Sequence, residues 1–477
     1  MDHNQPSKRA KIVATVGPAS QSKEVLTQLI KAGVNVFRLN FSHGEHETHA
    51  EVVQRIRQVN EELGTYVSIL QDLQGPKIRV EKVEEGEVFI EPGEELVITT
   101  ESLLGTSKKV STSYQDLPKD VQEGDVVLID DGNLELFVKQ VKGVEVICEV
   151  KYGGSLKSRK GINLPFTKVS APALTEKDIE DLEFGISQDV DWIALSFVRS
   201  VEDIQDLKNR IKKSGKDIRV VAKIEKPEAL KNIDEIIEAS DALMVARGDL
   251  GVEIVMEEVP MAQKMMVDKC NKASKPVIIA TQMMESMISN PRPTRAETND
   301  VANAVLDGAD AMMLSAETAA GKYPVETVQY MARTISSVES SAKIYDHFYD
   351  PNPDSDTFIN DNVMLAASKL GEQVGAQAIT GNTVSGYTAF KLSSHRPFAK
   401  IFIFTPNKNL LTKLGLVWGV EGFFYDSKES TDNTFNDQEE LLKKAGKLST
   451  GDIFITTASM PIHRQGRTNT LKINVAD

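Results

Sequence analysis

The sequence has few of the features that mark secreted, membrane or nucleic-acid-binding proteins. Only two of its 477 residues are cysteine. Cys148 and Cys270 each lie in or beside an apolar run, so we interpret both as buried free thiols of a reducing compartment. No apolar stretch approaches membrane-spanning length, and Met1–Ala10 carries no signal-peptide core. A net charge of −15 argues against sequence-independent nucleic-acid binding. We therefore expect a cytoplasmic protein with no membrane and no nucleic-acid partner.

The two familiar phosphate-binding loops are also missing. The sequence contains neither a Gly-x4-Gly-Lys-Ser/Thr loop nor a Gly-x-Gly-x-x-Gly loop. If the protein binds a nucleotide, it does so through another arrangement of side chains.

What the sequence does contain is a regular alternation of short apolar runs with helical patterns. The runs are residues 11–17, 34–41, 66–73, 191–198, 219–225, 241–247, 275–281 and 310–316. Eight such units predict a closed parallel barrel whose active site lies at the carboxyl ends of the strands. The polar residues at those ends are Arg38, Asn40, Ser42, Asp72, Glu225, Asp249, Thr281 and Glu317.

The alternation stops between about residues 78 and 170, where short alternating runs punctuated by glycine predict an inserted all-β domain. After a linker rich in Asp, Pro and Asn, strands alternate with helices such as 358–374 and 409–418, which predicts a small open α/β domain. The expected fold is therefore α/β: a (β/α)8 TIM barrel (1–76 and 172–346), an inserted β domain or lid (77–171) and a C-terminal α/β regulatory domain (347–477).

Two neighbouring strand ends carry the strongest chemical signal. Lys223 and Glu225 close one apolar run, and the segment Arg247–Gly251 closes the next. A lysine beside two carboxylates, Glu225 and Asp249, predicts a Mg²⁺ site next to a fixed positive charge. Such a site can stabilise charge on a phosphoryl group or an enolate. We also expect Gly248 and Asp249 to open a short helix whose N–H groups can bind a substrate carboxylate.

Several longer motifs resemble those of pyruvate kinases over essentially the whole chain. They are KIVATVGPAS (11–20), FRLNFSHG (37–44), KIE (223–225), MVARGDLG (244–251), ATQM (280–283) and PRPTRAE (291–297). The resemblance implies transfer of a phosphoryl group from phosphoenolpyruvate to ADP, giving pyruvate and ATP in the last step of glycolysis. It also implies Mg²⁺ (with Mn²⁺ as a possible substitute), ADP/ATP as partners, a phosphorylated effector and a homotetramer.

The resemblance assigns roles to individual residues. Lys223 matches the lysine that contacts the transferring phosphoryl group, and Glu225 and Asp249 match the Mg²⁺ ligands. Thr281 matches the threonine associated with protonating the enolate, where we expect a water relay with Ser315 and Glu317 because a threonine alone is a weak acid. The remaining assignments are Arg38 and Arg79 for phosphoryl groups, Arg38, Gly248, Asp249 and Thr281 for the substrate, and Asn40, His43 and Arg79 for the nucleotide.

Lys77 departs from many relatives, which carry glutamate there and need K⁺. The matching K⁺ ligands, Asn40, Ser42, Asp72 and the Leu73 carbonyl, are still present. We interpret the Lys77 ammonium as a replacement for the ion, so K⁺ should not be required. Ser200 is a second departure, since some relatives carry there a lysine that reaches the nucleotide.

In the C-terminal region, Thr383, Ser385, Gly386 and Thr388 precede or open a helix and match an effector-phosphate loop. Plain helix capping is the alternative interpretation. Tyr387 stands where relatives often have a basic residue, and Arg464–Asn469 differs from the usual glycine-rich loop, which leaves the effector's identity open.

Two other functions are compatible with parts of the pattern. A Mg²⁺-dependent lyase or aldolase would share the carboxylate-bound metal, and a non-catalytic metabolite sensor would need only the last domain. The inserted β domain argues against the first, and the joint presence of Lys223, Glu225, Asp249 and Thr281 argues against the second. His43, His46 and His49 are interpreted as a helix entry with two solvated histidines rather than a metal site.

Overall fold

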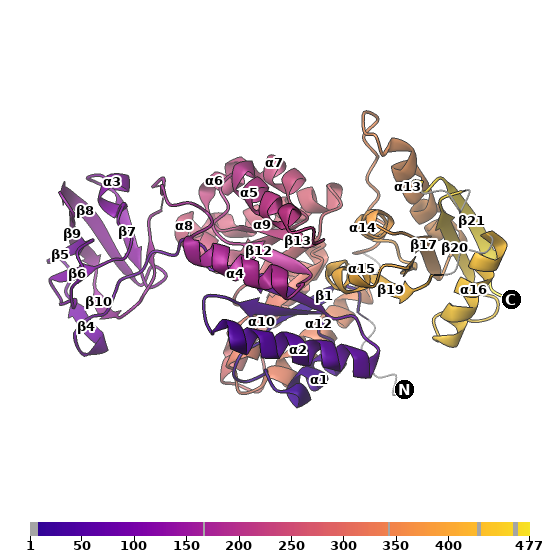
Figure 1. Ribbon diagram of the computed structural model, residues 1–477, viewed down its shortest axis with the longest axis horizontal. Coiled ribbons are helices and arrows are strands. Elements are labelled where there is room, and N and C mark those ends of the chain that lie inside the picture. The colour runs from indigo at the N-terminus through magenta and orange to yellow at the C-terminus, as the bar shows by residue number, and fades with distance from the viewer. Residues whose placement is uncertain (1–7, 166, 342–343, 427–430, 461–465) are drawn as a thin grey trace.

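The computed structural model describes residues 8–165, 167–341, 344–426, 431–460 and 466–477. Figure 1 shows three bodies in a row: an all-β domain, a central barrel and a C-terminal α/β domain. None of the described helices is long and apolar enough to cross a membrane.

The central body is a closed barrel of eight parallel strands, which confirms all eight predicted runs. The strands are β1 (Lys11–Thr15), β2 (Val36–Asn40), β3 (Ser68–Asp72), β12 (Trp192–Leu195), β13 (Arg219–Ile224), β14 (Ala242–Ala246), β15 (Val277–Ala280) and β16 (Ala311–Leu314). Each strand is almost wholly buried because it packs against neighbouring side chains on both faces, and this explains the continuous apolar runs.

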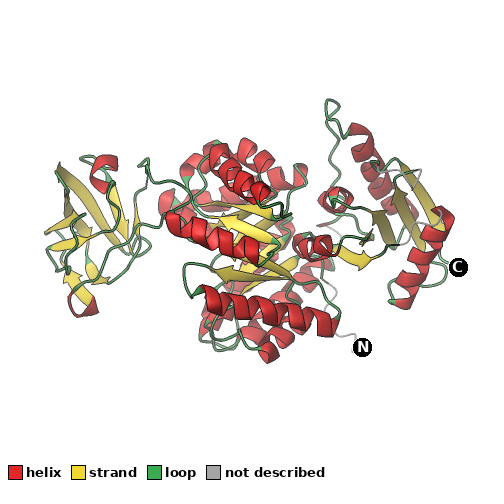
Figure 2. Ribbon diagram, in the orientation of Figure 1, coloured by secondary structure: helices red, strands yellow, loops and turns green. Residues whose placement is uncertain are grey.

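Helices surround the barrel (Figure 2). They are α1 (Lys23–Ala32), α2 (His46–Leu63), α4 (Glu176–Ser187), α5 (Val201–Lys213), α6 (Pro227–Lys231), α7 (Ile233–Ala239), α8 (Arg247–Glu253), α9 (Val259–Lys272), α10 (Arg295–Asp307), α11 (Ala316–Ala319) and α12 (Pro324–Glu339). Several of these helices begin at a residue whose side chain caps the first turn. The Thr175 hydroxyl accepts a hydrogen bond from the Asp178 amide, and the Asp178 carboxylate accepts one from the Thr175 amide, so the two residues form a capping box at the start of α4.

The all-β domain lies between β3 and α4, as predicted. Its strands form a six-stranded and a two-stranded sheet. They are β4 (Glu87–Ile90), β5 (Glu95–Thr99), β6 (Lys109–Ser111), β7 (Val126–Ile129), β8 (Leu134–Lys142), β9 (Glu145–Tyr152), β10 (Gly154–Lys157) and β11 (Ile162–Asn163), with one short helix, α3 (Leu117–Asp120). The strand pattern in the sequence did not reveal β6, β10 and β11. β6 and β11 have only three and two residues, too few to show alternation, and β10 has a single apolar side chain, Leu156.

The C-terminal domain is a five-stranded sheet in the order β19-β18-β17-β20-β21, with only β21 antiparallel. Its strands are β17 (Ala378–Asn382), β18 (Lys400–Thr405), β19 (Val420–Phe424), β20 (Ile453–Ala458) and β21 (Thr470–Val475). Its helices are α13 (Phe358–Val374), α14 (Tyr387–Ser394), α15 (Lys408–Lys413) and α16 (Thr431–Lys444).

The helix predicted over 409–418 was wrong in its extent. The α-helix ends at Lys413 and continues only as a 3₁₀ turn, Leu414–Leu416. The turn brings Gly415 against β3, where a side-chain carbon on Gly415 would come within 2.5 Å of the Ser68 hydroxyl oxygen. This tertiary contact, absent from the local pattern, decides where the helix ends.

The barrel interior and the C-terminal domain share one apolar core. Leu70, Trp192 and Met244 from the barrel belong to the same buried cluster as Ile401 and Leu416 from the C-terminal domain. The C-terminal domain therefore closes the amino end of the barrel, opposite the strand ends that carry the predicted site.

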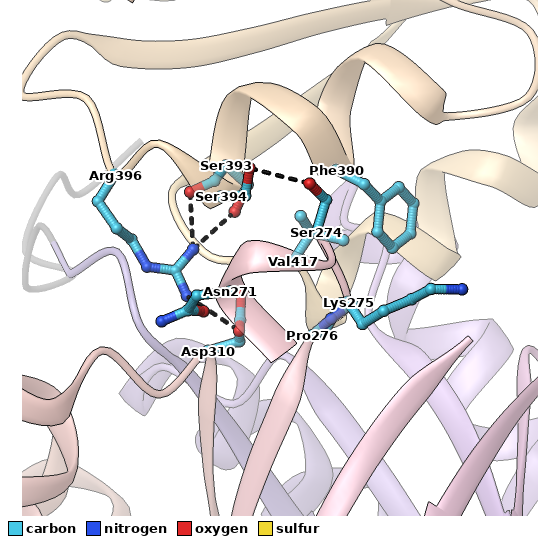
Figure 3. Close-up of a pocket in the computed structure, with 10 residues that line it drawn as sticks. All are labelled: Asn271, Ser274, Lys275, Pro276, Asp310, Phe390, Ser393, Ser394, Arg396 and Val417. Atoms are coloured by element: carbon cyan, nitrogen blue, oxygen red, sulfur yellow. Dashed lines mark hydrogen bonds and ion pairs between the residues drawn. The ribbon is translucent and has the colours of Figure 1, made fainter. Parts of the chain in front are cut away.

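A small hollow marks this junction (Figure 3). Buried Arg396 bridges it: one Nη donates to the Ser393 carbonyl at 2.7 Å, and the other to Asn271 Oδ1 at 2.7 Å and to Asp310 Oδ2 at 3.0 Å. This buried ion pair and its additional hydrogen bonds link the C-terminal domain to the barrel.

Candidate active site

Lys223 is the centre of a compact network at the carboxyl end of the barrel. Its Nζ lies 2.9 Å from Glu225 Oε1 and 3.1 Å from Asp72 Oδ1, and it donates to the Ser196 hydroxyl at 2.6 Å. The alternation of side chains along β13 places Lys223 and Glu225 on the same side of the chain. The structure thus brings together predicted residues from the ends of two different strands, β3 and β13.

The electrostatics of this network keep Lys223 charged. Burial lowers the pKa of the Lys223 ammonium, but the carboxylates of Asp72 and Glu225 raise it further, so the net shift is upward. For Asp72, burial raises the pKa, while Lys223 and Arg38 lower it by more, which gives a carboxylate that stays ionised. The result is a fixed cation beside a fixed anion in a site with little water.

Arg38 belongs to the same network. Its Nε donates to Asp72 Oδ2 at 2.7 Å, and one Nη donates to Thr15 Oγ1 at 3.0 Å. The guanidinium is only 9% exposed, and the residues that hold it come from β1 and β3, the two neighbours of its own strand. Arg38 is therefore a second preorganised cation next to Lys223.

The two predicted metal ligands differ in environment. Glu225 is buried, and its Oε2 accepts a hydrogen bond from the Phe197 amide at 2.8 Å. Burial raises the pKa of Glu225, Lys223 lowers it, and the negative charge of Asp249 raises it again. Asp249 is more open, and Lys77 Nζ lies 3.5 Å from its Oδ1. The two carboxylates are close enough to repel each other, and a divalent cation between them would relieve that repulsion.

Thr281 and Gly248 meet across β14 and β15. The short helix α8 begins at Arg247, as predicted, and the Gly248 amide donates to Thr281 Oγ1 at 2.8 Å. Thr281 Oγ1 in turn donates to the Ala280 carbonyl at 2.6 Å. The first turn of α8 therefore holds the threonine hydroxyl directly.

Glu317 is buried beneath the next strand end. Its Oε2 accepts from the Ser315 amide at 2.6 Å and its Oε1 from the Met284 amide at 3.2 Å. Burial raises the pKa of Glu317, and the hydrogen bonds lower it by less. Glu317 thus ties the loop after β15 to the loop after β16, on which Ser315 lies.

The remaining predicted residues have other partners than Lys223 in the described structure. Arg79 is in the β domain, where its Nη1 donates to the Arg159 carbonyl at 3.1 Å. His43 is exposed, and Asn40 Oδ1 accepts from the Ser42 amide at 3.2 Å. The Leu73 carbonyl accepts from the Ser196 hydroxyl at 2.7 Å. Lys77 contacts Asp249 rather than the residues that match K⁺ ligands.

The histidine interpretation needs one correction. His49 is buried, stacks on Phe41 at a ring distance of 4.2 Å and contacts the His43 carbonyl at 2.9 Å. His46 is half-buried and contacts Asp181 Oδ1 at 2.7 Å. The two helical histidines are packed rather than solvated, because α2 lays them against neighbouring rings. No group of three or more His, Cys, Asp or Glu suited to a metal occurs among the described residues.

The predicted effector loop precedes α14. Thr383 Oγ1 accepts from the Gly386 amide at 3.0 Å, and Ser385 Oγ accepts from the Tyr387 amide at 3.4 Å. The Thr388 hydroxyl contacts that of Thr468 at 3.1 Å. Arg219, which begins β13, donates to the Ser385 carbonyl at 2.8 Å. Arg464, part of the second segment compared with relatives, lies outside the described residues.

Sequence reasoning missed Ser196. Its hydroxyl links Lys223 Nζ to the Leu73 carbonyl, and it is 1% exposed. Ser196 directly follows β12, so its place at a strand end was the available signal. A serine is so common at such positions that the signal did not distinguish it from a turn residue.

Known proteins resemble this chain along most of its length. Residues 7–328 match the family model for the pyruvate kinase barrel domain, and residues 361–474 match that for the pyruvate kinase alpha/beta domain. The pyruvate kinase of Staphylococcus haemolyticus is 43% identical over 98% of this chain and 80% of its own length. Those of Staphylococcus saprophyticus and a strain of Staphylococcus aureus are also 43% identical, with the same coverage.

Proposed function

The chain belongs to the pyruvate kinase family, whose reaction moves a phosphoryl group from phosphoenolpyruvate to ADP, and we propose that the Lys223 network performs this transfer at the barrel mouth. The observation that carries the proposal is the buried Lys223 ammonium, 3.1 Å from Asp72 and 2.9 Å from Glu225. A preorganised cation in a site of low dielectric can stabilise the charge of the moving phosphoryl group and then of the enolate.

The substrate would be oriented by groups that the barrel already holds in place. Arg38 and Lys223 would face the phosphoryl group, and the first turn of α8, at Gly248 and Asp249, would receive the substrate carboxylate. Holding both ends of a small substrate lowers the entropic cost of reaching the transition state. Arg79 would join the nucleotide phosphates with Asn40 and His43 when the β domain moves towards the barrel.

The donor set fits a magnesium ion, the metal that the family generally uses. Glu225 and Asp249 offer only oxygen ligands, and Mg²⁺ commonly takes one or two protein carboxylates and leaves its other positions to water and substrate. When bound, the ion supplies Lewis-acid polarisation of phosphate oxygens. Mn²⁺ would suit the same oxygens. The protein's part is to hold Glu225 through the Phe197 amide and to keep Asp249 at the opening of α8.

After transfer, the enolate needs a proton on its methylene carbon. Thr281 is the proposed group at that step, with Ser315 and Glu317 completing the relay through water. Burial favours the protonated form of Glu317, which suits a group that stores a proton near the site.

We also propose three properties that follow from the family and from this chain's own residues. Lys77 would make K⁺ unnecessary. The loop formed by Thr383, Ser385, Gly386 and Thr388 would bind a phosphorylated activator. The enzyme would be a homotetramer. Within each subunit, the chain would pass between barrel and lid near residues 76–77 and 171–172.

A coupled assay of pyruvate formation tests the catalytic proposal. With phosphoenolpyruvate, ADP and Mg²⁺ we expect pyruvate and ATP in equal amounts, and without ADP we expect neither. Pyruvate release that does not depend on ADP would indicate a lyase or phosphatase-like reaction instead. The absence of any turnover, together with binding of phosphorylated metabolites, would favour a sensor.

A further inference from the structure

Two adjacent residues at the end of β15 have an unusual backbone. Thr281 and Gln282 have φ angles of +68° and +55°, in the left-handed region that side chains other than glycine rarely adopt. For β-branched threonine this conformation is strained, and it persists only where the surroundings impose it. The strained pair includes the residue whose hydroxyl is proposed to deliver a proton.

The Arg247 side chain supplies the constraint. Its Nη2 donates to the Thr281 carbonyl at 2.7 Å, and its Nε donates to the Ala280 carbonyl at 3.2 Å. A planar guanidinium can meet two successive carbonyls at once, whereas a lysine ammonium lacks this fixed fork. Arg247 thus clamps the backbone immediately before and within the strained turn.

The Arg247 guanidinium is itself held by residues on two outer helices. Arg247 Nη1 lies 2.8 Å from Asp300 Oδ1 on α10 and 3.5 Å from Gln263 Oε1 on α9. The Arg247 side chain is 16% exposed, so water competes little for these bonds. Two outer helices therefore set the orientation of the guanidinium.

The same residue connects the turn with α8. Arg247 is followed by Gly248, whose amide donates to Thr281 Oγ1 at 2.8 Å. One side chain and the next backbone amide therefore hold the carbonyl and the hydroxyl of the same threonine. Together they fix both the backbone and the hydroxyl of Thr281 relative to the first turn of α8.

We propose that Arg247 is a positioning residue for the proton-transfer half of the reaction, acting through Thr281. The proposal rests on the role assigned to Thr281 above. In that half-reaction a C–H bond forms at the methylene carbon of the enolate to give the pyruvate methyl group, and the hydroxyl recovers its proton from water. Among the described residues, the Arg247 side chain bonds to Thr281, Ala280 and Asp300 and not to Glu225 or Asp249, so its part is to hold the Thr281 hydroxyl in position.

The two halves of the reaction can be measured separately. Proton transfer is measured as the exchange of the pyruvate methyl hydrogens for deuterium in D₂O, with Mg²⁺ and ATP present. NMR monitors this exchange. Formation of ATP from phosphoenolpyruvate and ADP reports phosphoryl transfer, because released enolpyruvate can become pyruvate in solution. In Arg247→Lys we expect exchange to fall about 10–100-fold and ATP formation to fall by much less, since misplacing a reacting group has effects of this order. Asp300→Asn should show the same pattern to a smaller degree.

A double-variant cycle identifies the route of the effect. If Arg247 acts through Thr281, adding Arg247→Lys to Thr281→Ala should cause little further loss of exchange. Thermal unfolding and Mn²⁺ binding by electron paramagnetic resonance should match the parent in Arg247→Lys, because Glu225 and Asp249 are retained. Arg210→Lys is the matched control, because Arg210 pairs with Asp206 on the outer surface of α5.

Equal losses of exchange and of ATP formation, or losses that add in the double variant, would overturn the proposal. Normal exchange in Arg247→Lys together with lost exchange in Thr281→Ala would disprove the role of Arg247 and leave the role of Thr281 standing. Normal exchange in Thr281→Ala would remove the role of Thr281 itself, and the clamp with it.

Discussion

At the scale of single residues, the cost of burying charge explains how the site is organised. A buried ammonium is destabilising unless carboxylates and hydrogen bonds compensate for the lost hydration. Lys223 has two carboxylates and a hydroxyl within 3.1 Å, and Arg38 pairs with the same aspartate. The cations are therefore held in place before any substrate arrives, which a transition-state-stabilising site requires.

Lys223→Met should nearly abolish phosphoryl transfer, with a loss on the order of 10²–10³ or more, because a preorganised charge aimed at the transition state is removed. Steady-state rates and circular dichroism would be compared with those of Lys212→Met, which changes an exposed lysine on α5. Near-normal turnover by folded Lys223→Met would exclude Lys223 from the mechanism.

Glu225→Gln and Asp249→Asn should each shift the Mg²⁺ dependence of the rate to higher concentration, because each removes a charged oxygen ligand. A Mg²⁺ titration of activity, supported by direct Mn²⁺ binding, measures the shift. Unchanged midpoints in both variants would mean that the metal binds elsewhere.

Lys77 should make the enzyme independent of K⁺. A bound K⁺ beside an ammonium faces repulsion of about 4 kcal/mol at 4 Å and an effective dielectric constant of about 20. We expect full turnover with tetramethylammonium as the sole monovalent cation. Lys77→Glu should lose activity without K⁺ and recover part of it with K⁺, since Asn40, Ser42 and Asp72 remain. Strong K⁺ activation of the unmutated enzyme would contradict this role.

At the scale of elements, the strand ends and the loops that follow them carry the chemistry, while the outer helices hold those loops in position. The effector loop is an example at the other end of the barrel. Its Ser385 carbonyl accepts a hydrogen bond from Arg219, at the start of the strand that ends with Lys223 and Glu225. The loop is therefore in direct contact with the strand that carries Lys223.

Replacing both Ser385 and Thr388 with Ala should abolish activation by phosphorylated metabolites and leave the basal rate within about twofold, because the loop lies at the opposite end of the barrel from the site. Saturation curves for phosphoenolpyruvate with ribose 5-phosphate, AMP or fructose 1,6-bisphosphate would measure this. A failure of every such metabolite to shift the curve of the unmutated enzyme would rule out the regulatory role.

At the scale of the whole molecule, the barrel lies between two other domains of the chain. The β domain stands beyond one end and the C-terminal domain packs on the other (Figure 1). Arg79 lies in the β domain, where it donates to the Arg159 carbonyl, whereas the C-terminal domain is joined to the barrel by a continuous apolar core.

The junction with the C-terminal domain should respond to pH through Asp191. Its carboxylate accepts from the Ile69 amide at 2.8 Å and from the Thr412 hydroxyl on α15. Burial raises the pKa of Asp191 to about 6, against the lowering effects of the Thr412 and Ile69 hydrogen bonds and of Lys413 and Arg57. Because the folded state binds this proton more tightly than the unfolded chain, the contribution of Asp191 to stability falls as pH rises from about 4 to about 6.

Asp191→Asn should remove that pH dependence. As pH rises through this window, we expect the free energy of unfolding of the parent to fall relative to that of Asp191→Asn. Urea unfolding at several pH values measures this difference. A difference that stays constant between pH 4 and 7 would show that Asp191 titrates normally in the folded protein.

The sequence by itself determined the order of elements and the chemistry of the barrel mouth. Buried parallel strands must be continuously apolar, so eight such runs were visible, and the residues that end them, such as Lys223, Glu225 and Thr281, had to meet at one rim. The short strands β6 and β11 lacked enough residues for a pattern to appear, and β10 has only one apolar side chain, Leu156.

Only the tertiary structure decided which groups touch. Ser196 joined the Lys223 network, Lys77 paired with Asp249, and Arg247 clamped Thr281, although nothing in local spacing distinguished these side chains from ordinary surface residues. The helix after Asn407 ended at Lys413 because Gly415 had to approach β3. Periodicity reports which face of an element is buried, but contacts between elements depend on how the whole chain packs.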